Sequence, residues 1–164
     1  MRLQIDRADG HFAPTDAQVQ EAVDALLGTD GISLPDGLLE IRISPEHEIT
    51  RLNSEFLGET SVTDVIAFEL LEIDPSTGEL IVGCIAVNHD LAARNATAFV
   101  QEGHAQEGMM TALVAGEILL YIMHGVLHFA GYEDDLPEDR REMFDIADKV
   151  LKKLGHELIP YARS

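Results

Sequence analysis

Residues 124–134 read His-Gly-Val-Leu-His-Phe-Ala-Gly-Tyr-Glu-Asp, and this stretch decides both the fold and the candidate chemistry. It overlaps an uncharged run over 118–132, and the surrounding segment is apolar on nearly every side, which predicts a buried central helix over about 111–130. The uncharged run is shorter than the roughly 20 residues that a membrane span needs. His124 and His128 are four residues apart, so on a helix both imidazoles lie on one face.

The residues that follow the two histidines complete a possible metal site. Gly131 can end the helix in a left-handed conformation, and the turn would bring Asp134 back over the histidine face. Two imidazoles and one carboxylate form a tripod that leaves positions for water and substrate, as in a catalytic metal site. Other interpretations stay open. The two histidines could be core residues with hydrogen-bond partners in the protein, and the acidic residues could form a turn in which Asp135 caps the next helix. Glu133 or Asp135 could also replace Asp134 as the third ligand.

Hydrophobic periodicity outside this stretch predicts strands early in the chain and helices late. We expect strands at 3–5, 39–43, 62–70 and 80–87, the last two joined by a turn over 74–78. We expect helices after a capping box at Thr15 and Gln18, after Ser44 with Pro45 at its first position, from 90 to about 106, and from about 135 to 154. This order predicts an α+β fold of one domain, 1–164, in which helices cover a small mixed sheet.

The charge and cysteine content restrict the function classes. Eleven basic and thirty acidic residues give a net charge of −19, which repels phosphate backbones and anionic membranes. The single cysteine, Cys84, rules out a disulfide framework and is expected to be a small buried hydrophobe in its apolar run. Because the N-terminus has no apolar signal-peptide core, we expect a soluble cytoplasmic protein.

The 124–134 segment resembles the signature of the YbeY family, which reads His-Gly-x-Leu-His-Leu-x-Gly-Tyr-Asp-His. Residues 52–68 are similar to the family's Leu-Asn-x-x-Phe-Arg-Gly and Thr-Asp-Val-Leu-Ser-Phe blocks, and residues 78–82 to its Gly-Asp-Ile strand. The match covers about 38–155 in the same order, so this chain looks like a divergent member of the family.

The resemblance implies a metal-dependent hydrolase, regarded as an endoribonuclease of ribosomal RNA maturation. It implies one divalent ion, zinc, held by His124, His128 and Asp134 in a zincin-like cleft between the sheet and the central helix. It also implies ribosomal RNA and the small ribosomal subunit as partners, and neither DNA nor membrane. Asp64, in the second matching block, is the candidate catalytic proton acceptor, although it could instead be a turn or cap carboxylate.

Two other carboxylates are candidates for roles in the chemistry, and two isolated histidines are not. Glu133 and Glu117 are further candidate proton acceptors. Glu117 lies about two turns before His124, so it either orients an imidazole or faces solvent. His89 and His104 have no partner at a recognisable spacing and are expected at the surface.

Several positions depart from the family pattern. The third histidine of the signature falls at Asp134, which lowers the charge of the site by one unit and shifts its preference toward harder metals. The family's arginine falls at Leu57, which cannot contact a phosphate. Between 52 and 139 the chain has sixteen acidic residues and one basic residue. A phosphate contact therefore falls to Arg94, Arg140 or Arg141, or to a ribosomal partner.

Three functions remain open on the sequence alone. The first is a YbeY-like endoribonuclease, and the second is a non-catalytic ribosome-assembly or interaction protein that keeps the fold and possibly the metal. The third is a hydrolase of a neutral or cationic substrate such as a peptide. Gly125 argues against this third function, because zinc peptidases of the His-Glu-x-x-His type carry their general base at that position. The acidic composition could also reflect a high-salt habitat.

Overall fold

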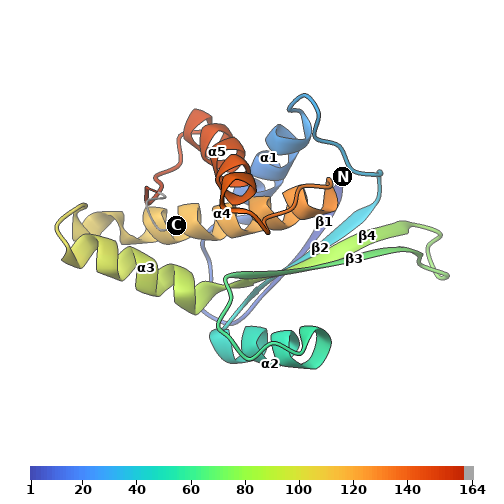
Figure 1. Ribbon diagram of the computed structural model, residues 1–164, viewed down its shortest axis with the longest axis horizontal. Coiled ribbons are helices and arrows are strands. Elements are labelled where there is room, and N and C mark those ends of the chain that lie inside the picture. The colour runs from blue at the N-terminus through green and yellow to red at the C-terminus, as the bar shows by residue number, and fades with distance from the viewer. Residues whose placement is uncertain (161–164) are drawn as a thin grey trace.

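A mixed sheet carries the fold, as the computed structural model of residues 1–160 shows (Figure 1). Its strands lie in the order β1 (Arg2–Arg7), β2 (Leu38–Ser44), β4 (Leu80–Asn88) and β3 (Val65–Ile73). β1, β2 and β4 are parallel to one another, and β3 pairs antiparallel with β4 at the edge. The expected hairpin of the last two strands is confirmed, with a short turn between them.

Helices cover both faces of this sheet. They are α1 (Asp16–Leu27), α2 (Glu46–Leu57), α3 (His89–Gln101), α4 (Met110–Phe129) and α5 (Pro137–Lys153), with a 3-10 turn, η1 (Glu107–Met109), before α4. In Figure 1, α1, α4 and α5 lie on one face, α2 lies on the other, and α3 runs beside α4. The predicted α+β fold, with helices over a small mixed sheet, is confirmed for residues 1–160.

Alternation along the strands explains why both faces are covered. Ile85 and Val87 of β4 belong to the main core against α4. Their neighbour Ala86 points the other way and packs with Ile66 of β3 and Ile49 of α2. Because side chains alternate with a period of two, these apolar strands bury residues on both sides and require a helix on each.

Helix α4 is the buried centre of the molecule. The segment Glu107–Phe129 is long and apolar enough to cross a membrane, and it is the one such segment within residues 1–160. However, 83% of its most apolar window is buried inside the protein, as expected for a core helix. Gly125 allows its close approach to the sheet, because a Cβ atom there would lie 2.9 Å from Cδ1 of Ile85.

The local signals for helix ends were correct at some positions and wrong at others. Thr15 and Gln18 form the predicted capping box, and Gly103, with φ of +84°, follows the end of α3. Ser44 does not cap α2: it is buried at the end of β2, and the N-cap residue is Pro45. The carboxylate of Asp90 caps this helix instead, accepting a 2.8 Å hydrogen bond from the Glu46 backbone N–H.

Three further expectations need correction. Strand β3 begins at Val65 rather than at 62, so Asp64 lies in the loop before the strand. Asp135 does not cap α5, whose N-cap residue is Leu136 without a side-chain hydrogen bond. Cys84 is half-buried rather than fully buried, and the burial it has raises the pKa of its thiol.

Candidate metal centre

The end of α4 and the loop after it bring His124, His128 and Asp134 together. Gly131 adopts a left-handed conformation with φ of +98°, and its N–H donates to the His128 carbonyl at 3.1 Å. The next N–H, of Tyr132, donates to the Leu127 carbonyl at 3.0 Å. These bonds close the helix and reverse the chain, so the loop returns over the histidine face.

Three ligand-type atoms meet at one point above this turn. The Nε2 atom of His124 lies 3.0 Å from Oδ2 of Asp134 and 3.0 Å from Nε2 of His128. The third distance, from His128 Nε2 to Asp134 Oδ2, is 3.6 Å. The structure thus groups Asp134 with the histidines, whereas its neighbours Glu133 and Asp135 have exposed side chains.

The protonation of His128 makes this point electron-rich. Its Nδ1 lies 3.1 Å from the Tyr132 carbonyl oxygen, which can only accept, so Nδ1 carries the proton and donates it there. The lone pair of His128 Nε2 then faces the Asp134 carboxylate and His124. A proton on His124 Nε2 can be donated to only one of these two acceptors at a time. The remaining lone pairs therefore converge without a donor, an arrangement that a cation satisfies.

The spacing of these atoms suits a small divalent metal ion. Tetrahedral zinc with ligand bonds of about 2.0–2.1 Å separates its ligand atoms by about 3.3–3.4 Å. The three observed separations, 3.0, 3.0 and 3.6 Å, bracket that value. Three protein ligands leave room for a further ligand, so the donor set fits a catalytic rather than a closed structural site.

His124 is held in the form that binds metals. Its side chain is 9% exposed and lies beside the Phe144 ring, with 5.4 Å between ring centroids. Burial lowers the pKa of His124, and neighbouring His128 lowers it further, while Asp64 and Asp134 act in the opposite direction. A lowered pKa keeps the imidazole neutral near pH 7, as coordination requires.

Two hollows meet at the centre, and Asp64 lines both. One has a volume of about 470 Å³ and reaches toward α3 and α5, and the other, about 510 Å³, runs along β3. The residues common to both are Thr63, Asp64, His124 and Asp134. The Asp64 side chain accepts a 2.8 Å hydrogen bond from the Val65 N–H, which is the turn role that the sequence left open. The same side chain also lines both hollows together with His124.

Asn88 holds the loop that carries Asp64. It is fully buried, and its amide Nδ2 donates to the Thr63 carbonyl at 3.1 Å and to the Glu46 carboxylate at 3.3 Å. Its backbone N–H donates to the Asp64 carbonyl at 2.8 Å. Its Oδ1 caps α3 by accepting from the Leu91 N–H at 3.0 Å. Asn88 is not among the site residues predicted from the sequence, although an asparagine between an apolar strand and a helix is a recognisable cap signal.

Glu117 lies in the wall of the first hollow and not at the surface. It is 1% exposed and accepts hydrogen bonds from the Tyr121 hydroxyl at 2.9 Å and from the Asn95 amide at 3.1 Å. Burial and the adjacent Glu117 raise the pKa of Tyr121 well above its usual value. Of the two alternatives that the sequence leaves open for Glu117, the solvent-facing one is therefore wrong.

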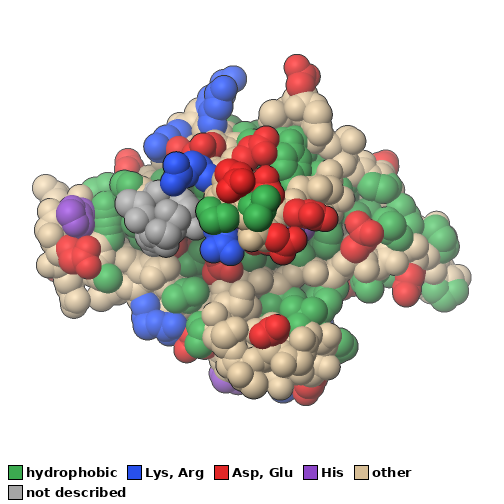
Figure 2. All heavy atoms as spheres, in the orientation of Figure 1, with side chains coloured by type: hydrophobic (Ala, Val, Ile, Leu, Met, Phe, Trp, Pro, Cys, Tyr) green, Lys and Arg blue, Asp and Glu red, His purple; other side chains and the backbone are tan. Residues whose placement is uncertain are grey.

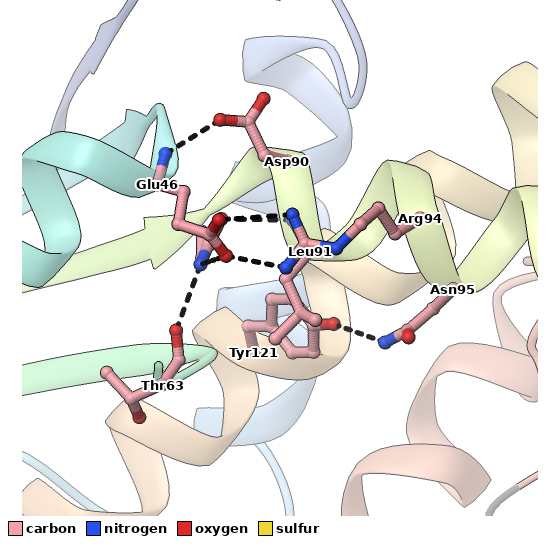
Figure 3. A network of polar contacts seen from close by, with 8 residues as sticks. Glu46, Thr63, Asp90, Leu91, Arg94, Asn95 and Tyr121 are labelled. Carbon is pink, nitrogen blue, oxygen red and sulfur yellow. Dashed lines mark hydrogen bonds and ion pairs between the residues drawn. The ribbon is translucent and has the colours of Figure 1, made fainter. Parts of the chain in front are cut away.

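The candidate phosphate-binding arginines have different environments. Arg94 is paired with Glu46, whose carboxylate is 3.2 Å from Nη1 (Figure 3). Arg140 lines the hollow of about 470 Å³, whereas Arg141 is exposed and lines neither hollow. Leu57, at the position of the family's arginine, lines the other hollow. On the face in Figure 2, acidic side chains spread over the centre and right, and basic ones gather near α5.

The surroundings of Gly125, His89 and His104 can be compared with what the sequence predicts for them. Gly125 faces Ile85 with no space for a larger side chain, so a glutamate base of the zinc-peptidase type does not fit there. His89 is not a surface residue: it is half-buried, and its ring stacks on His11 with 3.6 Å between centroids. His104 is exposed, as expected.

Comparisons with known proteins identify the family of this chain. The sequence profile of the family described as "Endoribonuclease YbeY" matches residues 6–155. A protein named Endoribonuclease YbeY from a Nocardioides species is 30% identical over 156 residues, which is 92% of this chain and 96% of the relative. One of the same name from Elusimicrobium minutum is 30% identical over 148 residues, 90% of this chain and 94% of the relative.

A solved structure shares the fold. The solution structure of TM1509 from Thermotoga maritima superposes with a TM-score of 0.55 at 23% identity, covering 94% of this chain and 91% of that one. The profile match and the two relatives extend over nearly the whole chain and include the segment that brings the histidines and Asp134 together. The chain belongs to the YbeY endoribonuclease family.

Proposed function

We propose that this protein is a single-metal endoribonuclease that cleaves single-stranded ribosomal RNA during maturation of the small ribosomal subunit. The observation that carries the proposal is the convergence of His124, His128 and Asp134 ligand atoms within 3.0–3.6 Å of one another. Membership of an endoribonuclease family supplies the reaction class. A ribosomal substrate assigns the protein to the cytoplasm.

Zinc is the ion that we propose for this site. Neutral imidazole suits zinc, and a carboxylate completes a common catalytic donor set. Such a bound ion supplies Lewis acidity toward a phosphoryl oxygen and lowers the pKa of water. The hollows on both sides of the ligands form the cleft that we equate with a zincin-like cleft.

The protein's own groups have separate tasks in this proposal. Asp64 lines both hollows next to the ligands, and we assign to it the acceptance of a proton from the attacking water. Asn88 fixes the backbone on both sides of that carboxylate through the Thr63 and Asp64 carbonyls. The Tyr132 carbonyl orients His128 through its Nδ1–H.

Cleavage of a single-stranded ribosomal RNA fragment by the zinc-loaded protein tests the proposal. We expect His128→Ala to lower the rate by about 100-fold or more, because one of three ligands is removed. Asp135→Ala is the matched control, since it removes an exposed carboxylate near the site and should leave the rate unchanged. Equal rates for wild type and His128→Ala would contradict a nuclease centre at these residues.

A second candidate is a non-catalytic ribosome-assembly protein with the same fold. Leu57 in the cleft and the excess of acidic residues around it favour this function, because both weaken the attraction of a phosphate backbone. A wild-type protein that retains zinc and binds small ribosomal subunits, but does not cleave RNA, would support this candidate over the first.

A further inference from the structure

We propose that Arg140 holds a phosphate group of the substrate beside the metal ligands, and that the hollow between α3, α4 and α5 is the phosphate-binding half of the cleft. This inference rests on the proposed function for the identity of the substrate as a nucleic acid. It assigns to α5 a substrate-binding residue, Arg140, whose role does not follow from membership of the family.

Arg140 shares a cavity with the candidate ligands. The hollow of about 470 Å³ is lined by Arg140 from α5, by His124 from α4 and by Asp134 from the loop between these helices. Within residues 1–160, no other lysine or arginine lines this hollow or the second one. Among residues 1–160, Arg140 is therefore the one lysine or arginine placed to contact a substrate in these two hollows.

The guanidinium of Arg140 is available for such a contact. The arginines that precede it are each paired with a carboxylate: Arg2 with Glu79, Arg7 with Asp16, Arg42 with Glu48, Arg51 with Glu55 and Arg94 with Glu46. Arg140 is exposed, and no carboxylate in the part of the chain that the structure describes forms an ion pair with it. Within the described residues its guanidinium is thus not held in an ion pair.

The residues that line the two hollows differ, and this difference indicates on which side of the metal ligands a phosphate group of the substrate would lie. The α5 side offers Arg140 together with a buried network in which Asn95 and Tyr121 donate to the Glu117 carboxylate. The β3 side, by contrast, is lined by apolar residues such as Leu57 and Phe129 and has Glu69 as a further negative charge. Each hollow therefore has one further carboxylate, but only the first has an arginine, so a phosphate is better accommodated on the α5 side.

The experiment compares Arg140→Gln, Arg140→Lys and Arg141→Gln in the zinc-loaded full chain. Arg141 is the matched control, because it is the adjacent exposed arginine on α5 and lines neither hollow. We expect Arg140→Gln to reduce kcat/KM on single-stranded RNA by about 10- to 100-fold, mainly through KM. Arg140→Lys should recover part of this loss, and Arg141→Gln should stay close to wild type.

A binding measurement separates this inference from the nuclease proposal. Fluorescence anisotropy of a short labelled single-stranded RNA is recorded against salt with each substitution in the His128→Ala chain. Loss of one phosphate contact should reduce the slope of log affinity against log salt by about 0.7 for Arg140→Gln and leave it unchanged for Arg141→Gln. This pattern without cleavage by the wild type would support Arg140 and contradict the nuclease.

Three results would overturn the role of Arg140. The first is identical kinetics and salt slopes for Arg140→Gln and Arg141→Gln. The second is a loss of kcat in Arg140→Gln with unchanged KM and a lowered melting temperature, which indicates a structural role. The third is a wild-type protein that neither binds nor cleaves the RNA, which would overturn the phosphate site and the proposed function together.

Discussion

At the scale of single residues, the site depends on how two histidines are oriented by their neighbours. The Tyr132 carbonyl fixes the proton of His128 on Nδ1, and burial keeps His124 neutral. Asp134 adds a carboxylate oxygen to the group, at the position where the signature that this segment resembles has a histidine. The donor set is therefore harder and one unit more negative than three imidazoles would be.

This difference predicts a change in metal preference for Asp134→His. We expect the variant to keep about one metal ion per chain and to prefer zinc over manganese more strongly than the wild type does, because imidazole replaces a carboxylate. Competition dialysis with equal zinc and manganese, followed by elemental analysis, measures the preference. An unchanged zinc-to-manganese ratio would contradict a ligand role for residue 134.

At the scale of elements, the cleft is held by contacts between the ends of strands and helices. Asn88 at the end of β4 connects the loop before β3 with the start of α2 and caps α3. Asp90 at the start of α3 caps α2. The backbone around Asp64 is thus held by Asn88 of β4, while its side chain accepts from the Val65 N–H of its own strand.

We expect Asn88→Ala to destabilise the protein by about 1–3 kcal/mol, because it removes the cap of α3 and the amide that donates to the Thr63 carbonyl and the Glu46 carboxylate. Thermal unfolding measures this loss, and RNA cleavage should fall by more than the stability change explains. Thr15→Ala is the control, since it removes the cap of α1 and should lower stability by about 1 kcal/mol without affecting cleavage. Equal effects of both variants on cleavage would contradict the positioning role of Asn88.

These elements also show how much the sequence could predict. The buried α4, the capping box at Thr15 and the approach of Asp134 to the histidines follow from residues close together in the chain, and the structure has all three. The cap of α2 and the stacking of His89 on His11 depend on partners 44 and 78 residues away, respectively, which no local pattern indicates. The same holds for Asn88, whose partner Thr63 is 25 residues distant.

At the scale of the whole molecule, the net charge of −19 is the dominant property. Acidic side chains spread over much of the face in Figure 2, and the arginines before residue 100 are already paired with carboxylates. Self-repulsion of the folded chain should therefore be strong at low ionic strength.

The charge predicts that the melting temperature rises as NaCl is increased from low to high concentration, because salt screens this repulsion. Differential scanning fluorimetry checks the prediction, and the same series in KCl controls for effects specific to sodium. A melting temperature that falls with salt would mean that attractive ion pairs, and not the net charge, control stability.

The central claim is that His124, His128 and Asp134 bind one metal ion. The most direct test is elemental analysis of protein purified without a histidine tag, for the wild type and for Asp134→Ala, after zinc loading and removal of excess metal. We predict about one zinc ion per wild-type chain and a much lower content in the variant. A wild-type protein without metal, or a variant that retains as much zinc as the wild type, would contradict the claim.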